Sequence, residues 1–119
     1  MALLPIEKVS KNTILRGVST SVVKMGKALC RILDDMRETM YAAEGVGLAA
    51  PQIGLNIRVV LCRFNHGTSH ETVVEMINPV IISISDEQEE GEEGCLSIPG
   101  KFDMVRRHKS LTVKFLDRK

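Results

Sequence analysis

An amphipathic segment near the N-terminus constrains the fold of this chain most strongly. From Val22 to Met40, apolar residues recur every three or four positions, with basic and acidic residues between them. The apolar positions are Val22, Met25, Leu29, Ile32, Leu33, Met36 and Met40. This spacing is typical of one helix face. Residues 19–21 offer candidate N-caps, and Gly45 is a plausible end, since glycine adopts the left-handed conformation that terminates helices.

After residue 56 the pattern changes to short runs rich in β-branched residues, which predict strands. Five such runs are found, at residues 57–64, 72–77, 80–85, 102–106 and 111–116. The polar tract 65–70 predicts a hairpin loop, and Asn78-Pro79 predicts a break between two strands. The acidic run 86–93 is typical of a solvated loop. The order of elements predicts an α+β fold, with one long N-terminal amphipathic helix packed on a mostly antiparallel β-sheet.

The composition limits the number of domains and the kinds of partner. With 119 residues, the chain is expected to form a single domain, residues 1–119. Its formal net charge of +1 argues against nucleic acid or a membrane surface as partner, because both require a basic excess. The N-terminus lacks the features of a signal peptide, and no window approaches the ~20 apolar residues of a membrane span. Three dispersed cysteines fit reduced thiols, so a cytoplasmic location is predicted.

Cys95 is the first candidate for chemistry. It follows a glycine in a predicted loop, after several carboxylates. The neighbouring Glu92 and Glu93 disfavour a bare thiolate nucleophile, whereas a bound metal would deprotonate the thiol. A metal ligand, a catalytic group and a structural thiol all remain open on these residues alone. The other cysteines, Cys30 on the helix and Cys62 on a strand, fit small buried hydrophobic residues.

A second unusual stretch, residues 45–54, reads GVGLAAPQIG. Its small residues suggest a backbone that comes close to a ligand, and Pro51 excludes a continuing helix. The likeness to a phosphate-binding G-x-G-x-x-G loop is weak, because the third glycine is missing and the stretch follows a helix. Gln52 can donate amide N–H groups to an oxyanion, although taken alone it also fits a turn glutamine.

Together, the stretches Gly45–Gln52 and Glu93–Ser97 resemble the first two signature motifs of the peptide deformylases, in order and in separation. The similarity extends through residues 32–41, through Ile77-Asn78-Pro79 and into Leu116-Asp117-Arg118, so it covers essentially the whole chain. This family removes the formyl group from the N-terminal formylmethionine of new bacterial-type polypeptides. The resemblance therefore implies a metal-dependent hydrolase of protein biosynthesis with an N-formylmethionyl peptide as its substrate.

The resemblance also implies the metal-binding and oxyanion-binding residues. Cys95 would be a thiolate ligand of a catalytic divalent metal, iron in the cell and often nickel or zinc in preparations. Gln52 and the backbone N–H of Leu96 would be the catalytic groups that stabilise the oxyanion formed on the formyl oxygen.

By the same resemblance, four positions would bind the substrate: Val46, Gly47, Glu93 and Gly94. Gly47 would supply backbone contacts to the peptide, with Val46 at the edge of the methionine pocket. Glu93 would in addition form a supporting pair with Arg107 behind the cysteine loop.

The family's third motif, a His-Glu-x-x-His helix that supplies two metal ligands and the general base, does not occur in these 119 residues. His66 and His70 do not replace it, because glycine stands where the glutamate should be and the tract is a predicted loop. A catalytic metal of this kind needs three protein ligands, and a general base contributes ~10²–10⁴-fold in rate. We therefore expect a C-terminally truncated deformylase domain that lacks its metal-binding helix and is inactive alone.

Exposed apolar surface left by that helix would favour a complementing C-terminal fragment or a homo-oligomer as partner. A hypothesis of a different class is a non-catalytic module that binds N-terminal peptides, or a partner-binding remnant. An unrelated thiol protein would have to carry both motifs by chance. Whether the chain is an enzyme stays open on the sequence.

Overall fold

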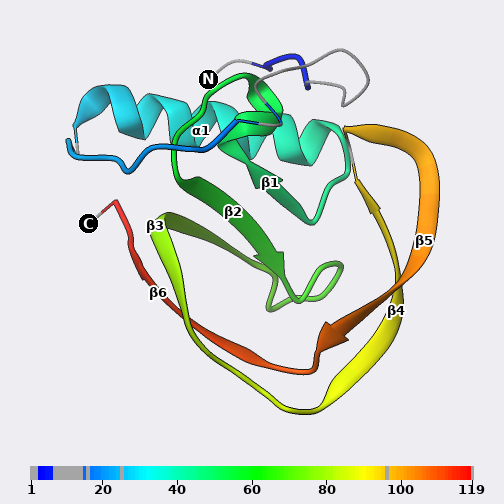
Figure 1. Cartoon of the computed structure of the whole chain (residues 1–119). Helices are drawn as coiled ribbons and strands as arrows, with labels where there is room; N and C mark the ends of the chain where they lie inside the picture. The colour runs from blue at the N-terminus through cyan, green and yellow to red at the C-terminus, as the bar shows by residue number, and fades with distance from the viewer. Residues whose placement is uncertain (1–2, 7–14, 16, 25, 96, 119) are drawn as a thin grey trace.

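The computed structural model describes residues 3–6, 15, 17–24, 26–95 and 97–118. Their elements are α1 (Lys27–Ala42), β1 (Gly47–Ala49), the 3-10 helix η1 (Ala50–Ile53), β2 (Val59–Phe64), β3 (Thr72–Ile84), β4 (Gln88–Cys95), β5 (Ile98–His108) and β6 (Leu111–Leu116). One antiparallel sheet has the strand order β1-β2-β3-β6, and β4 pairs with β5 in a second. Helix α1 lies along one side of the larger sheet (Figure 1). The predicted α+β fold is confirmed.

The apolar face of α1 packs against the larger sheet. The buried core consists of Leu29, Leu33, Met36, Met40, Leu48, Ala50, Ile53, Val59, Leu61 and Ile77. Four of these are predicted positions of the helix face, while Met25 lies outside the described residues. Full burial of such a side chain contributes roughly 1.5–3 kcal/mol. Helix α1 is too short and too polar to cross a membrane, and the described residues hold no other candidate.

Helix α1 begins later than the apolar pattern predicts, at Lys27 instead of Val22. Residues 21–24 are not helical, and other parts of the chain bind the backbone at Thr20 and Val22. Thr20 forms a parallel bridge with Ile57. The side-chain amide of Asn78 accepts a hydrogen bond from the N–H of Val22 and donates one to its C=O, both at 2.8 Å. These tertiary hydrogen bonds replace those of a first helical turn.

The left-handed residue that follows α1 lies one position before the predicted Gly45. The left-handed residue is Glu44, with φ of 57°, and not Gly45. The N–H of Glu44 bonds the C=O of Tyr41 at 3.1 Å, and the N–H of Gly45 bonds the C=O of Met40 at 2.9 Å. This pair of bonds is the Schellman arrangement, which satisfies the last carbonyls of a helix. It turns the chain directly into β1.

The predicted break at Asn78-Pro79 is wrong, since β3 continues through it from Thr72 to Ile84. The pairing of β3 with β6 shifts in register between Ile77 and Val80 instead. Asn78 has φ of 52°, a conformation that asparagine tolerates better than most residues. The side chain of Arg58 donates a hydrogen bond to the C=O of Pro79. Asn78 and Pro79 therefore form an irregularity within β3 and do not end the strand.

The predicted solvated loop at residues 86–93 is also wrong, because most of it belongs to β4. This strand pairs with the basic strand β5, so that Glu89 lies opposite Arg107 and Glu90 lies opposite Arg106. Two of the acidic residues thus face a residue of opposite charge, which stabilises the pairing, and Glu93, whose directly opposite residue is Asp103, bonds Arg107 instead. The side chains of this run are nonetheless mostly exposed.

The strands β3 to β6 form a nested pair of hairpins that changes direction at one corner. The larger sheet ends with β3 and β6, and β4 and β5 continue beyond it as a curved ribbon (Figure 1). At the corner, the N–H of Ser85 bonds the C=O of Ser110 at 2.8 Å, and the N–H of Lys109 bonds the C=O of Glu87 at 2.7 Å. The ribbon curves away from the sheet, and its tip, where Cys95 pairs with Ile98, returns toward β1 (Figure 1).

Candidate functional site

Gln52 lies on η1, the single 3-10 turn between β1 and β2. Pro51 occupies the first turn, where a missing N–H costs no hydrogen bond, and Gly54 ends it with φ of 88°. Gln52 Oε1 accepts a hydrogen bond from the N–H of Ala49 at 2.9 Å. A backbone N–H can only donate, so this bond identifies the oxygen of the amide and directs Nε2 to the other side.

The Nε2 group of Gln52 points at the tip of the β4–β5 ribbon. It donates a hydrogen bond to Ser97 Oγ at 3.3 Å. Ser97 is buried and lies in the two-residue connection between Cys95 and Ile98, which pair across the hairpin. The two sequence stretches, 45 residues apart at this contact, therefore meet in one place.

Gly47 begins β1, the strand that leads to Gln52, and Val46 directly precedes it. Val46 is 59% exposed, whereas Leu48 is buried in the core. Gly47 pairs with Cys62 of β2. A Cβ on Gly47 would lie 3.4 Å from the C=O of Leu61, an ordinary contact. Within the described part of the protein, packing therefore does not require a glycine here, and β1 is the edge strand of its sheet.

Glu93 and Arg107 form the predicted pair across the β4–β5 ribbon. Arg107 Nη2 lies 2.8 Å from Glu93 Oε1, and Arg107 Nε lies 3.1 Å from Oε2. This two-pronged geometry is the strong form of an arginine–carboxylate pair. The hydrogen bonds from Arg107 lower the pKa of the Glu93 carboxyl. The pair lies two residues before Cys95 on its strand, but both side chains are substantially exposed.

The described residues do not form a metal site. No group of three His, Cys, Asp or Glu side chains within them comes together to hold an ion. His66 and His70 lie in the loop between β2 and β3, and His108 ends β5 with its Nδ1 at 2.7 Å from the C=O of Ser85. The backbone of Cys95 is placed at the ribbon tip, but its side chain, and Leu96 altogether, lie outside the described part.

Ser97 is a residue for which the sequence alone indicates no role. It belongs to the second motif, and its position two residues after Cys95 is the one signal that places it near the site. The structure adds that it is hydrogen-bonded to Gln52 of the first motif. The other two cysteines are only partly buried, and burial raises the pKa of the Cys62 thiol.

Comparisons with known proteins identify relatives of this chain. The family model for polypeptide deformylases matches residues 3–119. The peptide deformylase of Syntrophomonas wolfei is 47% identical over 107 residues, which cover 90% of this chain and 66% of that protein. The peptide deformylase of Halothermothrix orenii is 41% identical over 118 residues, covering 99% of this chain and 73% of that protein.

Solved structures match as well. The peptide deformylase of Thermotoga maritima superposes with a TM-score of 0.91 at 36% identity, covering 99% of this chain and 76% of that one. A class I type b peptide deformylase from Acinetobacter baumannii gives 0.91 at 33% identity, covering 99% and 78%. This chain belongs to the polypeptide deformylase family. Eight of its curated relatives are spanned over only part of their own length, between 48% and 73%.

Proposed function

We propose that this chain binds the formylated N-terminus of new polypeptides in the cytoplasm and forms the peptide-binding and oxyanion-binding part of a peptide deformylase site. The observation that carries the proposal is the contact between Gln52 and Ser97. It brings the amide of the first motif against the ribbon tip that bears Cys95. Membership of the family supports the same substrate class.

Gln52 has the geometry of a preorganised donor. Its oxygen is held by the N–H of Ala49, so its Nε2 hydrogens face the ribbon tip without any reorientation. Such a donor stabilises negative charge where it develops, and the loss of one costs about 10²–10³ in rate. We propose that Gln52 Nε2 and the backbone N–H of Leu96 receive the formyl oxygen.

The open edge of β1 is proposed to bind the peptide backbone. In the strand order β1-β2-β3-β6, β1 is an edge strand. An edge strand offers N–H and C=O groups to which an extended peptide can add as a further strand. Gly47 allows such a peptide to approach closely, and the exposed Val46 would line the methionine side chain. Gly94 would border the other end, on β4.

Peptide deformylases are metal-dependent, and Cys95 is the position in this chain that the resemblance assigns as a ligand. The described residues do not supply a set of three ligands. Deformylation therefore requires two further ligands and a general base from a His-Glu-x-x-His segment, which these 119 residues do not contain. The same observation favours a second function for the 119 residues taken alone, namely peptide binding without catalysis.

The test measures peptide binding and formate release by the 119-residue chain, with iron or nickel added. We expect tighter binding of a formyl-Met peptide than of its unformylated form, with no turnover. Addition of a second polypeptide that carries a His-Glu-x-x-His helix should produce turnover, and Cys95→Ser should abolish it.

Two outcomes would change the proposal. Turnover by the 119 residues alone, lost on Cys95→Ser, would contradict the need for further ligands. The other outcome is equal binding of formylated and unformylated peptides, unaffected by metal, with no turnover when the second polypeptide is added. It would favour the non-catalytic peptide-binding module.

A further inference from the structure

Arg63 is a charged residue on the otherwise apolar strand β2, and only 12% of its side chain is exposed. Its guanidinium lies over the ring of Tyr41, 4.4 Å from the ring centroid. Its Nε donates a hydrogen bond to Glu71 Oε1 at 2.8 Å. A charge that is removed from water is stable only when it is paired and its donors are bonded. Tyr41 and Glu71 therefore provide the stacking surface and the opposite charge that keep the guanidinium stable in this position.

The same residue holds two successive carbonyls of the chain that leads into β1. Arg63 Nη1 donates to the C=O of Gly45 at 3.3 Å. Its backbone N–H donates to the C=O of Val46 at 2.8 Å. Both bonds lie just before Gly47, where β1 begins. One residue thus fixes the direction in which the chain enters the edge strand.

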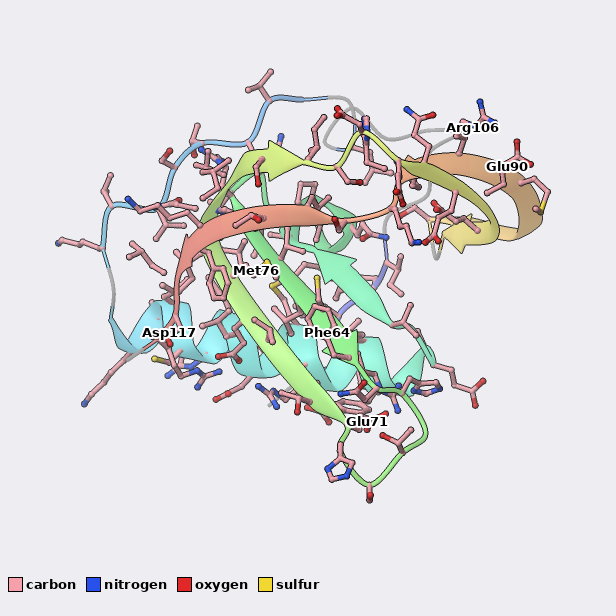
Figure 2. The ribbon with its side chains drawn as sticks, turned by 90° about the horizontal axis from the view of Figure 1, so that it is seen from below. Phe64, Glu71, Met76, Glu90, Arg106 and Asp117 are labelled. Atoms are coloured by element: carbon pink, nitrogen blue, oxygen red, sulfur yellow. The ribbon has the colours of Figure 1, made fainter. Side chains whose placement is uncertain are left out.

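The contacts of Arg63 come from three elements. Tyr41 is in the last turn of α1, residues 45 and 46 lead into β1, and Glu71 lies at the end of the loop between β2 and β3, on the side away from the ribbon (Figure 2). Glu71 Oε1 also accepts a hydrogen bond from the N–H of Gly67 at 3.2 Å and lies 3.1 Å from His66 Nδ1. The hydrogen bond from Arg63 is the main reason why the pKa of Glu71 is lowered. The carboxylate is therefore charged at neutral pH and holds the guanidinium in place.

We propose that Arg63 is a positioning residue for the peptide: it holds the Gly45–Val46 backbone so that the edge of β1 keeps the shape that binds an extended chain. This inference rests on the proposed function, in which β1 binds the peptide backbone. Arg63 is too deeply buried to be a main contact of the substrate. Its side chain acts through the carbonyl of Gly45, next to the bond that its backbone N–H makes to Val46. Its planar guanidinium, which can stack and bond at once, is required for the side-chain contacts.

The experiment compares Arg63→Met with Arg63→Lys and with a control, Arg106→Met. Methionine keeps the length and apolar character of the side chain but removes its charge and donors. Arg106 is an exposed arginine whose Nε lies 3.9 Å from Glu90, so its loss removes little. The dissociation constant of a formyl-Met peptide is measured for each 119-residue variant at a temperature where all are folded. Amide hydrogen exchange at positions 46–49 and 63 is followed without peptide.

We expect Arg63→Met to raise the dissociation constant about tenfold, the effect of losing one charge-assisted hydrogen bond. Exchange at position 63 and along β1 should accelerate, while residues 72–77 of β3 remain protected. In both measurements, Arg63→Lys should lie between the parent protein and Arg63→Met, since one ammonium group cannot reach both Glu71 and Gly45 while it stacks on Tyr41. Arg106→Met should match the parent protein in both measurements.

The outcomes separate this inference from the proposed function. If Arg63→Met unfolds more easily but binds peptide as the parent does, Arg63 is merely structural and the inference is wrong. Unchanged exchange along β1 would overturn it as well. If the parent chain binds no peptide, the proposed function fails, and the exchange measurement still decides whether Arg63 positions β1.

Discussion

The two parts of the candidate site are held in different ways. Gln52 stands on η1, whose Ala50 and Ile53 are buried in the core. The ribbon tip is carried by β4 and β5, which continue beyond the larger sheet and are paired mainly with each other. Figure 2 shows Glu90 and Arg106 on this ribbon, at a distance from Phe64 and Met76 on the larger sheet.

Buried apolar side chains and exposed ion pairs contribute different amounts to the free energy of unfolding. A fully buried apolar side chain contributes roughly 1.5–3 kcal/mol, whereas an exposed ion pair contributes about 0–1 kcal/mol. The part of the site with Gln52 is therefore tied to the global stability of the protein. The ribbon is held chiefly by its own ladder, its corner and its tip, and elements of this kind open locally before the protein unfolds.

The largest expected effect tests this difference directly. Leu61→Ala in β2 removes a side chain with 0% exposure, and such substitutions cost about 2–5 kcal/mol. Met104→Ala in β5 truncates a side chain that is 59% exposed, and its effect should stay within about 0.5 kcal/mol. Urea unfolding followed by circular dichroism measures both. Similar losses for the two variants would mean that the ribbon is part of the same cooperative core.

The next effect on stability concerns an ion cluster around Glu75, a buried carboxylate on β3. The side chain of Glu75 is 8% exposed and lies 2.6 Å from Arg118 Nη2 and 3.2 Å from Arg37 Nη2. Arg118 also pairs with Asp34 at 2.9 Å. We expect Glu75→Gln to lower the free energy of unfolding by about 1–3 kcal/mol, because two arginines lose a charged acceptor. The exposed Glu90→Gln serves as the control and should have little effect.

This cluster also predicts a dependence on pH. Burial acts to raise the pKa of Glu75, but the hydrogen bonds from Arg118 and Arg37 outweigh it and the pKa is lowered. The stabilisation is therefore present above the pKa of the unfolded chain and is lost as the pH falls through the lower, folded value. Urea unfolding between neutral and acidic pH should show a steeper loss for the parent than for Glu75→Gln. Parallel curves would contradict this assignment.

The sequence predicted the core better than the ribbon, for a physical reason. Helical spacing identified Leu33, Met36 and Met40 because apolar periodicity directly records which face is buried. The start of α1 was misplaced, because the side chain of Asn78 binds Val22 across 56 positions and no local pattern contains that contact. β4 was taken for a loop because the local sequence shows only its run of carboxylates and not the arginines of β5 that pair with several of them.

For the candidate site, the motifs predicted which two stretches of the sequence form it, but not which side chains bring them into contact. The pair of Glu93 and Arg107 was expected from the resemblance and is present. Ser97 and Arg63 were not assigned, since each acts through a contact that only the folded chain creates. The roles of Cys95 and Leu96 stay predictions.

A smaller effect tests whether the two parts of the site are coupled. Gln52→Met and Ser97→Ala each remove one side of the hydrogen bond that joins them. In a double-mutant cycle on the free energy of unfolding, we expect a coupling of about 0.5–1.5 kcal/mol, the net value of one hydrogen bond. Zero coupling would mean that this hydrogen bond does not hold the tip against η1. The hydrogen bond would then contribute nothing to the position of Cys95.

The smallest expected effect lies on the ribbon alone. Glu93→Gln replaces the carboxylate that pairs with Arg107, and Glu87→Gln, whose carboxylate lies 3.5 Å from Lys109, is its matched control. Because the pair is exposed, global unfolding should be unchanged. Amide exchange of residues 88–95 should accelerate for Glu93→Gln and stay as in the parent for the control. Since Arg107 lowers the pKa of Glu93, the pair persists above the ordinary glutamate pKa and is lost below its own.

The same loosening should therefore appear in the parent protein at acidic pH, as loss of the Arg107 Nε–H signal in NMR spectra. If Glu93→Gln instead lowers global stability as much as Glu75→Gln does, the ribbon and the core unfold together. The tip that carries Cys95 would then be as rigid as Gln52, and opening of the site would require unfolding of the whole protein.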